Sequence, residues 1–158
     1  NTVNSLSQYN INGNRAFSTT GTSNVFAGES TGTAGTANAF FGANAGDANT
    51  SGSGNTIIGA NADVGSAGLS NSTAIGQNAT VTQSNSVVLG AVGGVNGGSD
   101  VKVGIGTTAP KEKLEVKGNV FISEPGQGVI LRPTAGTTCT LLKADGSGGL
   151  TVSSIPCP

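Results

Sequence analysis

The amino-acid sequence predicts an all-β protein: a parallel β-solenoid with an N-terminal hairpin and a C-terminal β-hairpin domain stapled by a disulfide. Three observations predict it. A short apolar phrase that ends in glycine recurs six times between residues 24 and 106. The composition suits tight turns, with 27 glycines and only 9% charged residues. Two cysteines, Cys139 and Cys157, lie near the C-terminus.

The repeated phrase joins a polar residue, two or three apolar or β-branched residues and a glycine, as in Asn55-Thr56-Ile57-Ile58-Gly59. Successive closing glycines are 14, 17, 17, 14 and 14 residues apart. A period of this size is typical of short strands that stack as coils. Glycine is expected at each corner because it adopts backbone conformations that other residues adopt poorly. The six turn glycines are Gly28, Gly42, Gly59, Gly76, Gly90 and Gly104.

Each phrase carries two apolar rows, because successive side chains of a strand point to opposite faces. The row directly before the glycines contains Phe41, Ile58, Ile75, Leu89 and Val103. The row one place earlier contains Phe26, Phe40, Ile57 and Val88, and it is interrupted by Ala74 and Lys102. One narrow coil has a single interior, so two apolar faces imply a core and a partner surface. We expect the residue before each glycine to seal an oligomer.

The N-terminal 20 residues are predicted to form an arm and a hairpin. Asn12-Gly13 lies between two alternating segments, which is the pattern of a type I′ hairpin turn. We expect this hairpin to cap the first coil. The polar arm, residues 1–7, is expected to reach a neighbouring molecule and add a strand to an exposed edge.

Basic residues become frequent after Asp100, since six of the seven Lys and Arg residues lie from Lys102 onward. This change marks the end of the repeats, and the chain as a whole is predicted to contain four segments. Thr108 and Pro110 are placed to start one short helical turn, since threonine caps helices and proline tolerates the first helical position. A strand with a turn or bulge is expected over residues 114–122. The predicted segments are 1–20 (arm and hairpin), 21–100 (β-roll repeats), 101–127 (connector with the helical turn) and 128–158 (C-terminal hairpin domain).

The C-terminal segment predicts two strands around the turn at residues 145–149. Pairing about a centre near residue 148 places Cys139 opposite Cys157. An even number of cysteines in a chain rich in Gly, Asn and Thr favours a disulfide and an oxidising, extracellular setting. Such a cross-link stabilises the domain by about 3 kcal/mol.

Several motifs carry a family resemblance. The phrases NSTAIG (71–76) and NSVVLG (85–90) resemble the head repeats of trimeric autotransporter adhesins, which are left-handed parallel β-rolls of three chains around an axis. The phrase NAFFG (38–42) looks more like bacterial tail-fibre-like surface proteins, and VGIGTTAPKEKLEVKGNV (103–120) is similar to a connector of phage tail fibres and bacterial trimeric fibres. The resemblance covers roughly residues 9–122 and implies a homotrimer with a structural role.

The sequence contains few residues that could form a catalytic or metal-binding site. The chain has no histidine, which removes the usual nucleophilic triads and most zinc sites. The carboxylates in the repeats (Glu29, Asp47, Asp63 and Asp100) are widely spread, whereas a glycosidase needs a close pair. The net charge of −1 argues against nucleic acid, and no apolar run approaches the ~20 residues of a membrane helix. We expect no enzyme activity, cofactor, metal or membrane insertion.

The expected function is that of a structural subunit of an extracellular trimeric fibre or filament that polymerises head to tail and mediates surface adhesion. The expected partners are further copies of the chain and surface glycans, and the expected location is extracellular or at the cell surface. The sequence has neither an initiator methionine nor a signal peptide, which we expect of a mature, processed product or of a trimmed chain. Two alternatives remain open: a phage or phage-like tail-fibre segment that binds a host surface glycan, and an ice- or glycan-binding solenoid suggested by Thr31-x-Thr33 and Thr80-x-Thr82.

Overall fold

The structure is a computed structural model that describes residues 8–32 and 34–158. All of its regular elements are β-strands, as predicted. The chain divides into two compact units, Asn1–Lys117 and Gly118–Pro158, which are described separately below. Over the described ranges, no helix has the length and apolar character needed to cross a membrane.

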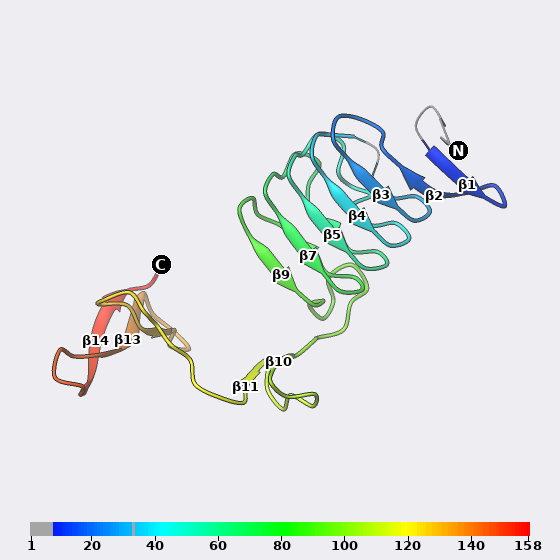
Figure 1. Cartoon of the computed structure of the whole chain (residues 1–158). Helices are drawn as coiled ribbons and strands as arrows, with labels where there is room; N and C mark the ends of the chain where they lie inside the picture. The colour runs from blue at the N-terminus through cyan, green and yellow to red at the C-terminus, as the bar shows by residue number, and fades with distance from the viewer. Residues whose placement is uncertain (1–7, 33) are drawn as a thin grey trace. The chain divides into compact units, whose positions relative to one another are not determined.

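The first unit contains a β-solenoid of about six turns, which confirms the predicted fold. Five three-residue strands pair in parallel, one per coil (Figure 1). Two further strands, β6 (Asp63–Val64) and β8 (Thr80–Val81), form a second parallel wall. The five strands of the main ladder are β3 (Val25–Ala27), β4 (Ala39–Phe41), β5 (Thr56–Ile58), β7 (Thr73–Ile75) and β9 (Val87–Leu89).

The middle residue of each ladder strand points into the core. Phe26, Phe40, Ile57 and Ala74 are in direct register and are fully buried. The rings of Phe26 and Phe40 stack with centroids 5.0 Å apart. Small or β-branched residues on the opposite side of the coil leave room for the large side chains of the ladder strands, so a narrow coil can close around them. These residues are Ala45, Ala62, Ala79, Val64 and Val81.

The corner glycines lie where coils approach most closely. Gly42 and Gly59 have φ of 134° and 136°, a region that favours glycine. A Cβ atom at Gly59 would lie 2.5 Å from the carbonyl oxygen of Gly76 in the next coil. The corner therefore requires glycine for two reasons, backbone conformation and lack of space.

A ladder of buried asparagines precedes the strands, and sequence reasoning missed its burial. The side-chain oxygen of Asn24 accepts a hydrogen bond from the backbone N–H of Asn38 (2.8 Å), and Asn38 accepts one from Asn55 in the same way (2.9 Å). The Asn55 side-chain oxygen accepts from the Ser72 N–H (2.9 Å), and its amide donates to the carbonyl of Leu69 (2.7 Å). These contacts satisfy polar groups that would be costly to bury unpaired.

The predicted N-terminal hairpin is present. β1 (Gln8–Ile11) and β2 (Asn14–Ser18) pair antiparallel around Asn12 and Gly13, whose φ values are 53° and 85°. β2 then pairs antiparallel with β3 and so closes the first coil. Arg15 donates hydrogen bonds to the carbonyl and the hydroxyl of Thr31. In the next coil the equivalent carbonyl, that of Ala45, accepts instead from a backbone N–H of the preceding coil, that of Gly32. The predicted arm, residues 1–7, lies outside the described residues.

The sixth phrase does not join the ladder, which corrects the prediction for Val103 and Gly104. β10 (Val103–Ile105) pairs instead with β11 (Leu114–Val116) in a separate parallel sheet. Lys102 would occupy the inward position of this phrase, where an unpaired ammonium group is costly to bury. Asp100, at the asparagine position, pairs with Lys113 at 2.9 Å.

The connector differs from the prediction in two further ways. The helical turn expected after Thr108 is wrong, because residues 107–113 contain only bends. The backbone N–H groups of Ala109 and Lys111 donate to the side chains of Thr107 and Glu115, and these described residues make no backbone hydrogen bond of a helical turn among themselves. The predicted strand over residues 114–122 ends at Val116.

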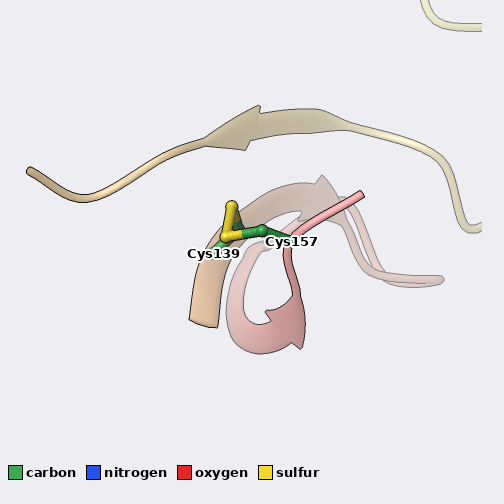
Figure 2. The surroundings of a disulfide bond; sticks show 2 residues. All are labelled: Cys139 and Cys157. Carbon is green, nitrogen blue, oxygen red and sulfur yellow. A yellow bond between two sulfur atoms is a disulfide. The ribbon is translucent and has the colours of Figure 1, made fainter. Parts of the chain in front are cut away.

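The second unit is a three-stranded antiparallel sheet of β12 (Val129–Leu131), β13 (Thr138–Ala144) and β14 (Leu150–Pro156). It confirms the predicted hairpin and the Cys139–Cys157 disulfide, whose Cα atoms are 4.9 Å apart (Figure 2). The predicted register is wrong, because Cys139 lies opposite Ile155. Cys157 follows β14 directly and donates its N–H to the Thr137 carbonyl, so the cross-link is diagonal.

Candidate assembly surface

The outward side chains of the main sheet form one continuous apolar row, which we call the outer row. Backbone register aligns one member on every strand of the seven-stranded sheet, from the hairpin to the last coil. The large members are 39–55% exposed, so none of them belongs to the core. The outer row consists of Tyr9, Phe17, Ala27, Phe41, Ile58, Ile75 and Leu89.

A second row runs beside the outer row, two residues earlier on each parallel strand. It consists of Val25, Ala39, Thr56, Thr73 and Val87. Neither row contains a charged residue. Adjacent strands are ~4.8 Å apart, so the outer row extends over about 29 Å. Contiguous apolar surface of this kind is typical of interaction sites.

The structure separates the two predicted rows clearly. Phe26, Phe40 and Ile57 lie in the core. Val88, the last predicted member of that row, is only partly buried. From the other predicted row, Phe41, Ile58, Ile75 and Leu89 lie on the exposed face, and Val103 lies in the connector sheet instead.

Sequence reasoning missed two aromatic members of the outer row, Tyr9 and Phe17. Both belong to the N-terminal hairpin, and their direct pairing continues the row beyond the repeats. The Asn12-Gly13 turn by itself would place Tyr9 opposite Ala16. A register shift between Tyr9 and Asn10 brings Tyr9 opposite Phe17 instead, and no signal in the sequence predicts that shift.

A groove of about 670 Å³ lies at the β9 end of the outer row. Ile75 and Leu89 of the outer row contribute to it, together with Val101 and Val103 from the connector. Lys102 also lines the groove. The apolar surface therefore continues past the last coil as a shallow depression.

A polar cleft of about 480 Å³ lies at another corner of the coils. The side chains of Asn44, Asn61 and Asn78 form a ladder there, with amide-to-oxygen distances of 2.9 and 3.3 Å. Asp47 and Asp63 also line the cleft. Burial raises the pKa of Asp63, and the charge of Asp47 adds to this rise, while backbone N–H donors oppose it.

The other carboxylates named in the sequence are not part of this cleft. Asp100 lies beside Lys113, whose hydrogen bond is the main cause of a lowered Asp100 pKa. Glu29 is exposed and does not line the cleft. Within residues 8–32 and 34–158, no three His, Cys, Asp or Glu side chains converge as metal ligands would.

The threonine pairs do not form a common exposed row. Thr31 is 1% exposed and is held by Arg15, so its hydroxyl is unavailable to a surface ligand. Thr33 lies outside the described residues. Thr80 belongs to β8, where it pairs with Asp63 rather than with another threonine.

Comparisons with protein-family models, with curated proteins and with solved structures found no match to this chain. The function is therefore argued from the surfaces described above.

Proposed function

We propose that this protein is the structural subunit of an extracellular fibre or filament in which three chains associate side by side through the outer row. The observation that carries the proposal is the unbroken apolar row across all seven strands of the main sheet. A sheet with one buried and one apolar exposed face requires a second layer to remove that face from water.

The outer row suits association with identical chains in parallel. Around a threefold axis along the stack, each residue meets its own copies at the same height, so Ile58 contacts Ile58 and Phe41 contacts Phe41. Because the two rows carry no charge, this arrangement brings no like charges together. The side chains are already half-buried, so completing their burial contributes about 1 kcal/mol each.

The disulfide supports the extracellular location. Cys139 and Cys157 are joined, and such bonds persist in oxidising compartments. In the fibre, the role of the chain is structural, because it contributes packing surfaces and no chemistry. Surface adhesion results from the many copies of the chain that one fibre exposes. Polymerisation head to tail is part of the proposal and requires a contact at the ends of the solenoid.

The test is the mass of the particle in solution, measured by multi-angle light scattering. The native chain should give three times 15.2 kDa or a larger assembly. Ile58→Asp places three carboxylates near the axis and should reduce the particle to monomers. The matched control is Val92→Asp, an exposed loop position outside both rows, which should leave the mass unchanged. A native chain that remains monomeric at high concentration would contradict the proposal.

A second candidate function is glycan binding by a phage or phage-like tail-fibre segment. The polar cleft of Asn44, Asn61 and Asn78 favours it, since amides and carboxylates form the hydrogen bonds that sugars offer. A glycan array read with native protein and with Asn61→Ala tests this function. Equal glycan binding by both chains would argue against the cleft as the binding site. The finding of fibres attached to cells without capsids would argue against a phage source.

A further inference from the structure

The two ends of the solenoid differ in how they are closed. At the first coil, β2 pairs with β3, and Ser18 lies beside Phe26. At the last coil, β9 has only one sheet neighbour, β7, among the described strands. Val88 is partly exposed there, whereas the equivalent residues of the four earlier coils are fully buried. The core is thus capped at one end and unfinished at the other.

The unfinished end also leaves backbone groups of β9 without partners. In the four earlier coils, the N–H of the first strand residue donates to a carbonyl of the next coil at 2.8–2.9 Å, as Thr73 does to Ser86. The last residue's carbonyl accepts from the next glycine, as Ile75 does from Gly90 at 2.7 Å. The matching groups of β9 are the Val87 N–H and the Leu89 carbonyl, and neither has a partner in the described residues. Such an edge is a template for another strand.

A segment of this same chain carries the sequence of a coil strand. Residues 1–5 read Asn-Thr-Val-Asn-Ser, and their first three match the start of the β5 phrase, Asn55-Thr56-Ile57, with valine in place of isoleucine. In this alignment Val3 takes the inward position. The segment has no charged residue, as the strands of the ladder have none.

The segment cannot reach β9 of its own chain. The seven strands from β1 to β9 are separated by six steps of ~4.8 Å, about 29 Å in all. The seven residues before β1 span at most about 25 Å when fully extended. A strand added to β9 must therefore come from another molecule.

We propose that residues 1–4 of a second copy pair in parallel with the free edge of β9, with Val3 covering Val88. This inference rests on the proposed fibre function and names the contact that joins its subunits end to end. In this register the Val87 N–H donates to the Asn1 carbonyl. The pairing ends after Asn4, because the Val101 side chain of the acceptor lies over Gly90, at the place that the next coil's corner residue takes in the earlier coils.

The contact uses different surfaces on the two molecules. A donor segment on one copy and an acceptor edge on the next form a heterologous interface, which repeats into an open filament when its rotation does not close a ring. Backbone hydrogen bonds provide the affinity, and the match between Val3 and Val88 sets the register.

The test is a disulfide formed between two separately prepared full-length variants. In the proposed register Thr2 lies directly opposite Val87, on the exposed face. When Thr2→Cys and Val87→Cys chains are mixed and oxidised, a cross-linked dimer should appear on a non-reducing gel. Peptide mapping should place the new bond between residues 2 and 87 and leave Cys139–Cys157 intact.

Two matched controls define the result. Val25→Cys has the same residue change on β3, which is an interior strand, and should cross-link at least tenfold less. Leu89→Cys lies on β9 itself and should also cross-link weakly, because it faces Thr2 only if the segment runs antiparallel. Adding Val3→Asp to the Thr2→Cys chain should abolish the link to residue 87.

Equal cross-linking of Val87→Cys and Val25→Cys, or no cross-linking, would overturn the inference. A preferred link from residue 89 would overturn the parallel register, and a link from Val87→Cys to Tyr9→Cys would show that β1 occupies the edge instead. Trimers that lack the link leave the proposed function intact. A link between chains that are monomeric before mixing would refute the trimer while supporting this contact.

Discussion

The solenoid and the C-terminal sheet bury apolar side chains to very different extents. The solenoid has a continuous core in which Phe26, Phe40 and Ile57 are inaccessible to solvent. In the C-terminal sheet, Cys139 is the only buried residue, and Val129, Ile130 and Leu131 are each 45–50% exposed. The solenoid is therefore held by stacking of its repeats, and the C-terminal sheet depends on its disulfide. The predictions that follow test this difference, from the largest expected effect to the smallest.

The neighbouring residues Phe40 and Phe41 provide the sharpest test of the solenoid core. Phe40→Ala leaves a cavity beside Phe26 and should lower the free energy of unfolding by about 3–5 kcal/mol. Phe41→Ala removes a side chain that is 42% exposed and should cost about 1 kcal/mol or less within one chain. Urea unfolding followed by circular dichroism measures both. Similar losses for the two variants would mean that the inner and outer rows are not distinct.

Removal of the disulfide should affect only the C-terminal sheet. Cys139→Ser together with Cys157→Ser should destabilise that sheet by about 3 kcal/mol, because the bond closes a loop between residues 18 positions apart. Hydrogen exchange should show lost protection over β13 and β14 and unchanged protection over β4, β5 and β7. Loss of protection in the solenoid as well would show that the two units do not unfold independently.

The corner glycines should tolerate substitution only where space is free. Gly59→Ala places a Cβ against the Gly76 carbonyl in addition to a strained φ, and we expect a loss of about 2–3 kcal/mol. Gly94→Ala is the matched control, since its φ is also positive but a Cβ there has no neighbour within 4 Å. It should cost about 1 kcal/mol. The thermal midpoint of each variant compares them, and equal midpoints would contradict the close stacking of the corners.

The smallest expected effect is a pH dependence of opposite sign in the two units. The raised pKa of Asp63 means that its ionised form destabilises the solenoid, so this contribution is relieved as pH falls through that pKa. The pKa of Asp145 is lowered, first by the Ser147 side chain, so the ionised form favours the folded turn of the C-terminal sheet. That contribution is lost as pH falls through the lowered pKa.

Asp63→Asn and Asp145→Asn each remove one of these contributions. Relative to the native chain, Asp63→Asn should show its largest stabilisation at neutral pH and none in acid. Asp145→Asn should be least stable relative to the native chain at neutral pH, with the difference vanishing in acid. Hydrogen exchange of each unit between pH 3 and 7 measures both trends, and a pH-independent difference for either variant would refute the assignment.

The sequence by itself determined the repeat, the corner glycines and the hairpin at Asn12-Gly13. These features are local: a turn residue or an alternation of side chains acts within a few positions, so it can be identified without knowing its neighbours in space. The division of Phe40 and Phe41 between two faces follows from the same alternation. The assignment of the inner row to the core, and the place of Tyr9 and Phe17 in the outer row, required the pairing of strands.

Only the tertiary structure decided where the repeat stops. The spacing from Gly90 to Gly104 equals that of earlier coils, yet Val103 leaves the ladder because Lys102 would face the core. The burial of Asn38 and Asn55 also depends on the next coil, which supplies the N–H groups and carbonyls that they bind. The cysteines were found from sequence, but their diagonal contact depends on the register of β13 and β14, which places Cys139 opposite Ile155. The residues within a coil determine its conformation, and the contacts between coils determine how many coils stack.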